Sequence, residues 1–407
     1  MTSERRQTAQ AKGLALRVSL LYAAIFVVVG NHMPYMPVWL NWRGLSSSEI
    51  AIVLAAPLFG RVLFTPFVSF LADRSGDYRR VLIVLAWGSL ICFLALNPAR
   101  SFWLILTILT VQSMFWTSVM PLSEVVAMAG VRAHGLDYGR MRVWGSLTFI
   151  LASIGGGVTL QALGAGSVVW ILSAGALCTV GAAYLVPPRS SDPKAALARK
   201  RINAGDALAL ARAPVFVLFV LSASAVNASH AVLYTFGSLH WQAQGLSSAW
   251  IGSLWAIGVL AEIVVFAFSA RVLRSAAPAH LIAIGALAAL VRWPVMAFDP
   301  PLALLIACQV LHGATFGMAH LGAIHFIGAA IPEHQAGTAQ GLYASVSGGI
   351  VMGLATVAAG PLYAALGANA FAIMALPGVI AVIGCWWVQR IWHGGMIGGP
   401  ARAPLSP

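Results

Sequence analysis

Five ionisable side chains interrupt segments of this sequence that are otherwise apolar. In the first half, Glu124 lies near the end of one apolar segment and Arg142 at the start of the next, with a short basic turn between them. In the second half, Glu262, Arg292 and His312 lie in three successive apolar segments. Charged groups inside a membrane are costly, so they commonly mark a binding site or an ion pathway. These two groups are therefore the first candidates for chemistry.

The chemistry open to them is ligand binding and proton exchange. An arginine binds a carboxylate or paired hydroxyl groups through its planar fork, and Glu124 can neutralise Arg142 while the site is empty. The proton affinity of a carboxylate changes between an apolar environment and a neighbouring arginine, which makes Glu262 beside Arg292 a workable proton switch. The alternative for Glu124 and Arg142 is a structural salt bridge between two helices.

The composition indicates that the elements carrying these residues cross a membrane. The chain of 407 residues is 60% hydrophobic and 9% charged, against about 25% charged residues in soluble proteins. Its mean hydropathy is +0.86. A membrane helix needs about 20 mostly apolar residues. By this criterion we predict twelve spans, at 17–40, 46–72, 80–97, 101–127, 141–163, 167–187, 213–240, 247–270, 279–298, 302–330, 337–364 and 369–391.

The basic residues predict how these spans are oriented. With the N-terminus inside, twenty of the 24 Lys and Arg residues fall on inner segments, as the positive-inside rule requires. Arg43 and Arg100 fall on outer loops, while Arg61 and Arg292 lie within spans. Orientation thus explains the net charge of +13, and we expect no nucleic-acid partner. The expected location is the lipid bilayer of a bacterial inner membrane, with both termini cytoplasmic.

A basic polar interval divides the spans into two sets of six. The predicted organisation is a cytoplasmic tail (1–16), a six-helix bundle (17–187), a cytoplasmic linker (188–212), a second six-helix bundle (213–392) and a cytoplasmic tail (393–407). GLSSSEI at 44–50 recurs as GLSSAWI at 245–251, and the same offset of 201 places Arg61 on Glu262. We infer a duplicated six-helix unit, and such repeats with a site between them are typical of transporters.

One inner loop carries a recognisable pattern. Residues 70–80 read FLADRSGDYRR and resemble the cytoplasmic signature of the major facilitator superfamily. The usual leading glycine is Ser69 here, Asp77 and Tyr78 lengthen the turn, and the matching residues are Asp73, Arg74, Gly76, Arg79 and Arg80. The resemblance implies that this loop is a cytoplasmic gate closed by ion pairs. The alternative is the ordinary positive charge of an inner loop.

Further segments narrow the resemblance. DYGRMRVWGS at 137–146 resembles the start of helix 5 in the oligosaccharide:proton symporters, the lactose permease group. RVLR at 271–274, LVRW at 290–293 and LHGATFG at 311–317 are more similar to the phenylpropionate permease family. The resemblance implies an all-α membrane protein with the major facilitator fold, in which twelve transmembrane helices form two six-helix bundles around a central cavity.

The resemblance also implies a substrate site in the first half. Glu124 and Arg142 are 18 residues apart, as are the sugar-binding Glu and Arg of the lactose permease group. Phe149 follows Arg142 by seven residues, on the same helix face, where those permeases place a stacking Trp. The alternative for Phe149 is a core position.

In the second half, Glu262, Arg292 and His312 match the proton-coupling Glu, Arg and His of the same symporters. One departure matters, because the carboxylate that follows this His by three residues in those symporters is Thr315 here. The proton carrier is therefore open between Glu262, His312 and Glu124.

A second set of polar and aromatic residues lies mostly on the first and seventh spans, whose helices line the cavity in this superfamily, and Trp116 precedes Glu124 on the fourth span. These further substrate-binding candidates are Asn31, Tyr35, Trp116, Asn227, His230 and Tyr234. The alternative for each is a hydrogen bond or a packing contact between helices.

Two other expectations follow from the sequence. Arg61 is either a cavity residue or a side chain that reaches the membrane surface. No metal-ligand spacing, nucleotide-binding loop or catalytic nucleophile is found, so we expect no enzyme, metal or cofactor.

These features predict a monomeric secondary active transporter that takes up a small organic solute together with protons by alternating access. An excess of arginines and histidines over carboxylates within the spans favours an aromatic or short carboxylate, such as a phenylpropionate-like acid. The alternatives are a sugar or nucleoside symporter, a drug-type proton antiporter that exports its substrate, and a membrane sensor without transport.

Overall fold

The structure is built from helices. The computed structural model describes residues 3–188 and 204–397, and every regular element among them is helical. Twelve stretches of helix are long and apolar enough to cross a membrane, which confirms the predicted all-α architecture with twelve spans. Residues 189–203 of the predicted linker and 398–407 of the predicted tail lie outside the described part. The division of the chain at that linker stays a prediction.

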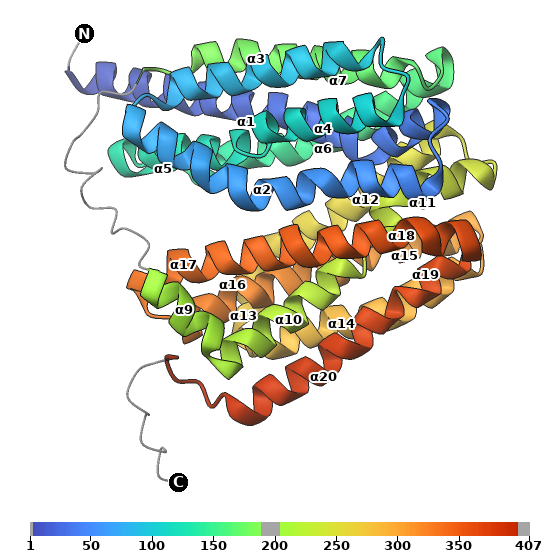
Figure 1. The fold of residues 1–407 in the computed structure, drawn as a ribbon. Coiled ribbons are helices and arrows are strands. Elements are labelled where there is room, and N and C mark those ends of the chain that lie inside the picture. Colours follow the sequence, from blue (N-terminus) through green and yellow to red (C-terminus); the bar gives the residue numbers. More distant parts are fainter. Residues whose placement is uncertain (1–2, 189–203, 398–407) are drawn as a thin grey trace. The chain divides into compact units, whose positions relative to one another are not determined.

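The contacts group the chain into two compact units, and the first comprises Met1–Ala196 with Phe236–Ala256. Within it, α1 packs against α6 and α7, and α3 packs against α4 and α7 (Figure 1). Its helices are α1 (Ser3–Trp42), α2 (Ser47–Ser75), α3 (Tyr78–Leu96), α4 (Phe102–Trp116), α5 (Val119–His134), α6 (Tyr138–Leu163) and α7 (Ser167–Leu185), with most of α11 (Ala231–Ala243) and the first part of α12 (Ser248–Ala267).

The second unit comprises Leu197–Thr235 with Ile257–Pro407. In it, α14 packs against α16 and α20, and α10 also packs against α20. The elements that lie entirely within this unit are α9 (Ala204–Arg212), α10 (Pro214–Ala228), α13 (Ser269–Ser275), α14 (Pro278–Ala297), α15 (Leu302–Val310), η1 (Gly313–Met318), α16 (Ala319–Ala330), α17 (Glu333–Ala344), η2 (Ser345–Val351), α18 (Met352–Leu366), α19 (Asn369–Ile373) and α20 (Ala375–Ile391).

Several spans are not continuous α-helices. The fourth span is interrupted between α4 and α5, and the seventh between α10 and α11. The tenth and eleventh spans contain the π-helical segments η1 and η2. A π-helical turn widens the helix locally and is frequent at functional sites. In the sequence, Pro121 lies just after the break between α4 and α5, whereas no proline lies at the other three irregular segments.

Two turns that are predicted to be external have the same geometry, which supports the inferred duplication. Gly44 and Gly245 have φ of 87° and 85°, in the left-handed region that glycine adopts readily. Each is followed at the same offset by a serine, Ser46 or Ser247, whose hydroxyl accepts a hydrogen bond from the backbone at the start of the next helix. The repeated GLSS letters thus encode the same helix end and the same N-cap, 201 residues apart.

Two turns that are predicted to be cytoplasmic also resemble each other in geometry. Gly76 and Gly135 end their helices with φ of 67° and 63°, and an aspartate then begins the next helix. Asp77 accepts a hydrogen bond from the backbone of Arg80 at 3.0 Å, and Asp137 accepts one from Arg140 at 3.0 Å. Asp77, which lengthens the predicted gate motif, is therefore the N-cap of α3.

Close helix contacts in the first unit depend on small residues. A Cβ at Gly157 of α6 would collide with the carbonyl of Ser248, and a Cβ at Gly252 of α12 would collide with the carbonyl of Ser153. The hydroxyl of Tyr35 donates to the backbone carbonyl of Ser153 at 2.5 Å and lies 3.4 Å from the backbone carbonyl of Ser248. The start of α12 is therefore packed backbone to backbone against α6, beside α1.

Candidate functional site

Arg292 on α14 is completely buried although it carries a permanent charge. Taking an ion out of water costs several kcal/mol unless hydrogen bonds replace the lost hydration. Arg292 donates to Thr315 Oγ1 at 2.9 Å, to His312 Nδ1 at 3.0 Å and to Gln309 Oε1 at 3.1 Å. Its guanidinium carbon lies 4.5 Å from the centre of the Trp293 ring. Neutral partners and one aromatic ring thus hold the charge.

The three polar partners come from one side of the tenth span. Gln309 belongs to α15, His312 to the junction before η1, and Thr315 to η1 itself. Spacings of three residues place side chains on the same side of a helix. Since α14 packs against η1 and α16, this side faces Arg292. The resemblance to the symporters grouped Arg292 with His312 as coupling residues, whereas Gln309 was not singled out. Its only signal is a polar residue three positions before His312 in an apolar span.

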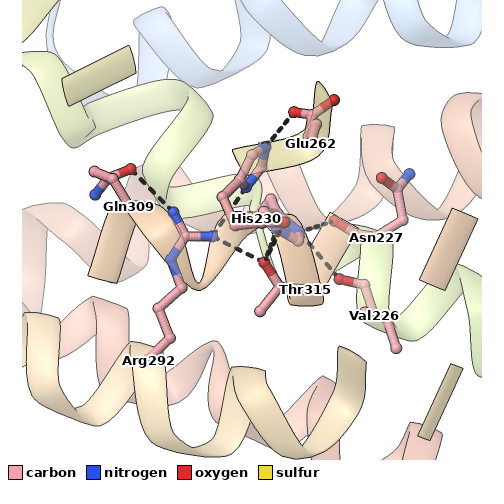
Figure 2. Close-up of polar contacts among 8 residues, drawn as sticks. Val226, Asn227, His230, Glu262, Arg292, Gln309 and Thr315 are labelled. Carbon is pink, nitrogen blue, oxygen red and sulfur yellow. Dashed lines mark hydrogen bonds and ion pairs between the residues drawn. The ribbon is translucent and has the colours of Figure 1, made fainter. Parts of the chain in front are cut away.

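Glu262 of α12 completes this cluster. Its Oε1 lies 2.9 Å from His312 Nε2, and both side chains are largely buried. Small residues allow the approach, because a Cβ at Gly313 would lie 2.9 Å from the carbonyl oxygen of Ala261. The predicted coupling residues are thus linked within the second unit, since His312 contacts both Arg292 and Glu262. Figure 2 shows Arg292 and Glu262 in this cluster.

His230 joins the same cluster from the interruption between α10 and α11. It is fully buried, and its Nε2 lies 3.0 Å from Thr315 Oγ1. Its Nδ1 lies 3.1 Å from the carbonyl of Val226 and 3.2 Å from that of Asn227 (Figure 2). The sequence suggested His230 as a substrate ligand. The structure places it against Thr315, at the position of the missing carboxylate.

The other two substrate-binding candidates on the seventh span lie close to His230. Tyr234 stacks on His230 with ring centres 5.3 Å apart. Asn227 donates through Nδ2 to the carbonyl of Ser347 in η2, at 3.3 Å. The interrupted seventh span is therefore tied to both π-helical segments, to η1 through His230 and to η2 through Asn227.

The first unit holds the second pair of charges. Arg142 Nε lies 3.8 Å from Glu124 Oε1, and about a third of each side chain is exposed, 29% and 31%. The guanidinium carbon of Arg142 lies 4.4 Å from the centre of the Phe26 ring and 5.6 Å from that of Tyr22. Tyr22 and Tyr138 both interact electrostatically with Glu124. This is a loose, accessible ion pair bordered by aromatic rings.

The remaining candidates of the first unit lie at varying depth. Phe149 and Tyr35 are buried in the contact of α1 with α6. Asn31 is also buried and donates through Nδ2 to the carbonyl of Val27 on its own helix at 2.8 Å. Trp116 is half-buried and packs against the core that includes Leu122. Their assignment to a substrate site stays a prediction, and Phe26 is the aromatic neighbour of Arg142 that the sequence did not suggest.

The predicted gate residues form several local contacts. Tyr78 donates a short hydrogen bond to Asp73, and Arg79 donates to the carbonyl of Tyr184 on α7 at 2.9 Å. Arg80 pairs with Asp77 at 2.9 Å. Arg74 is exposed at the end of α2. These contacts hold the turn and attach it to α7, and a gating role stays a prediction.

Arg61 lies on the exposed side of α2. Among the residues that the structure describes, no ion-pair partner is found for it. Its role inside the membrane stays open between a cavity residue and a side chain that extends to the surface.

Comparison with known proteins identifies the class. Residues 15–373 match the MFS_1 like family, so the chain belongs to this family of major facilitator transporters. The crystal structure of the nucleoside transporter NupG superposes with a TM-score of 0.82 at 15% identity, covering 93% of this chain and 100% of that one. This likeness confirms the major facilitator fold.

Two relatives are similar in sequence over most of their length. A protein of Escherichia coli K12 described as a "Probable 3-phenylpropionic acid transporter" is 30% identical over 365 residues, which are 88% of this chain and 94% of that protein. The maltose permease of Geobacillus stearothermophilus is 26% identical over 351 residues, 84% and 86% of the two chains. The chain is a membrane transporter of the major facilitator type.

Proposed function

We propose that this protein is a proton-coupled symporter that takes up a small organic acid with an aromatic or short carbon skeleton, of the 3-phenylpropionate kind. The observation that carries the proposal is the setting of Arg142. The Arg142 side chain is partly exposed, and its ion pair with Glu124 is long, at 3.8 Å. The ring of Phe26 lies against its guanidinium group. A carboxylate can displace Glu124 from such an arginine, and an aromatic ring can pack beside it.

The second cluster is suited to a different task. Arg292 already makes hydrogen bonds to three side chains and is inaccessible to a solute in this arrangement. Its link through His312 to Glu262 joins a permanent charge to a group that can gain or lose a proton. We therefore assign substrate binding to Arg142 with Glu124, and proton coupling to Glu262 with Arg292 and His312.

The relative described as a 3-phenylpropionic acid transporter supports the substrate class, because it aligns over nearly the whole chain. The maltose permease supports a second candidate, a neutral sugar. In that case Glu124 and Arg142 would bind paired hydroxyl groups as acceptor and donor. We further propose a bacterial inner membrane with both termini cytoplasmic, a gate at the 70–80 loop, and a monomeric protein.

Uptake into proteoliposomes tests the proposal and separates the two substrates. We expect radiolabelled 3-phenylpropionate to accumulate above equilibrium when the outside is acidic, and a protonophore to abolish accumulation. Unlabelled cinnamate should compete, whereas maltose should not. Competition by maltose without competition by aromatic acids would favour the sugar. Accumulation only under an alkaline outside buffer would instead indicate an exporter.

A further inference from the structure

The hydrogen bonds around Arg292 have a fixed direction, because an arginine donates and cannot accept. Arg292 donates to His312 Nδ1 at 3.0 Å, so this ring nitrogen carries no hydrogen. The hydrogen of a neutral His312 is therefore on Nε2, where it is donated to Glu262 Oε1 at 2.9 Å. His312 is neutral in this arrangement, and its contact with Glu262 is a hydrogen bond rather than an ion pair.

The same reasoning extends through Thr315 to His230. The oxygen of Thr315 accepts from Arg292 at 2.9 Å, and its hydrogen has two acceptors within reach, His230 Nε2 at 3.0 Å and, at a longer 3.5 Å, the carbonyl of His312. Nδ1 of His230 faces the carbonyls of Val226 and Asn227, both acceptors, and therefore carries the other hydrogen. A proton added to His230 would place a second positive charge beside Arg292, in a fully buried site. His230 is thus also held neutral.

We propose that Glu262 takes up the coupling proton, and that Thr315 and His230 are positioning residues that hold Arg292 against His312. This inference rests on the proposed proton coupling and names its carrier. A proton on His312 Nδ1 would turn an acceptor into a donor aimed at the donors of Arg292. A proton on Glu262 preserves its hydrogen bond with His312, because a protonated carboxyl group still has an oxygen that accepts from Nε2.

The charged and titratable groups that face Glu262 support this assignment. His312, at the start of η1, contacts Glu262 directly, while Tyr234 of α11, Arg292 of α14 and His320 of α16 interact with it electrostatically. Arg292 is the one permanent charge among these four. The electrostatic attraction between Arg292 and the Glu262 carboxylate depends on the position of the guanidinium group. Thr315 helps to fix that position through its hydrogen bond with Arg292.

The test is infrared difference spectroscopy of the purified full-length protein in nanodiscs, without substrate. The C=O band of a protonated carboxyl group is followed as pH is changed. We expect one band that titrates with a single midpoint and is lost in Glu262→Gln. In Thr315→Val the released guanidinium is drawn to Glu262, so this midpoint should move to lower pH by about one unit. Thr315→Ser keeps the hydroxyl group and should therefore have the same midpoint as the wild type.

A matched control separates position from folding. Thr235 is equally buried on the neighbouring α11, and its hydroxyl donates to the carbonyl of Ala231 on its own helix at 2.7 Å. Thr235→Val should leave the midpoint unchanged. If Thr315→Val does not fold, Thr315→Ala removes the same hydroxyl without adding bulk and should give the same shift.

Two results would overturn the inference. Persistence of the band in Glu262→Gln would place the proton on another group, and an unchanged midpoint in both Thr315→Val and Thr315→Ala would remove Thr315 from the positioning residues. Since no substrate is added, failure here is distinct from failure of the proposed function. Absence of any gradient-driven uptake by the wild type would reject the function, while the carboxyl titration still decides the proton site.

Discussion

At the scale of single residues, the two arginines of this transporter differ in how firmly they are held. Arg292 is fully buried and makes hydrogen bonds to three neutral side chains. Arg142 is partly exposed and has one long ion pair with Glu124. An arginine with satisfied donors is a fixed charge, whereas one with an accessible fork can recognise a ligand. This difference is the reason for assigning them separate tasks.

Arg142→Lys should weaken binding of 3-phenylpropionate at least tenfold. A lysine keeps the charge but loses the planar fork, and the loss of one charge-assisted hydrogen bond costs about 1.5–3 kcal/mol. Isothermal titration calorimetry measures the change. Arg140→Lys is the control, because this exposed neighbour at the start of α6 lies outside the site. Equal affinities of Arg142→Lys and wild type would remove Arg142 from the site.

Gln309→Leu should destabilise the protein because it removes an acceptor from the buried Arg292. The expected cost is about 1–3 kcal/mol, which corresponds to a lower Tm by several degrees in a thermal unfolding scan. Gln112→Leu is the matched control, since Gln112 is equally buried but donates to a neutral serine, Ser89, at 2.9 Å. A larger loss in Gln112→Leu than in Gln309→Leu would contradict the role given to Gln309.

At the scale of elements, small residues and interrupted helices decide which side chains meet. Glycines let α12 approach the tenth span, which brings Glu262 to His312. Glycines also let the start of α12 touch α6. The interruption of the seventh span presents His230 to η1. The site is therefore assembled by local departures from regular helix as much as by the helices themselves.

Gly157→Ala should destabilise the packing of α6 on α12, because its Cβ would collide with the carbonyl of Ser248. Forcing an added methyl into a packed contact costs about 1–3 kcal/mol. Gly155→Ala, two residues away on the same helix, meets nothing within 4 Å and should leave Tm nearly unchanged. Tryptophan fluorescence during heating compares the two variants. Equal Tm values would mean that this contact is not maintained.

The sequence predicted what depends on residue type and spacing. Apolar length and basic loops predicted the twelve spans, and the resemblance to the symporters grouped Arg292 with His312. It did not predict the participation of Gln309, the contact of His230 with Thr315, or the stacking of Arg142 on Phe26. These contacts depend on helix interruptions and on helix rotation, neither of which has a period or a motif in the sequence.

At the scale of the whole molecule, the duplication of the chain and the distribution of its charges lead to the same predicted membrane orientation. The turns that begin with Gly44 and Gly245 have the same geometry, 201 residues apart. Both lie on the side predicted to be external, where Arg43 is the one arginine next to them, whereas the turns at Gly76 and Gly135 are each flanked by two or more arginines. The charge bias therefore predicts opposite faces of the membrane for the two kinds of turn.

Cysteine labelling tests this orientation. In a variant without the four native cysteines, Gln242→Cys near the second glycine turn should react with a membrane-impermeant maleimide in intact cells. His134→Cys, next to Gly135, should react only after permeabilisation. Both positions are exposed in the structure, so their reactivity depends on the side of the membrane. The reverse pattern would invert the predicted topology.

The measurement that tests the central claim most directly counts protons and substrate together. Proteoliposomes without a gradient receive 3-phenylpropionate while external pH and labelled uptake are recorded. The wild type should take up protons with the substrate, so that the external medium becomes more alkaline. Glu262→Gln should still exchange internal for external substrate, but should neither move protons nor accumulate substrate under an imposed pH gradient. Full uphill accumulation by Glu262→Gln, or wild-type uptake without proton movement, would contradict the account.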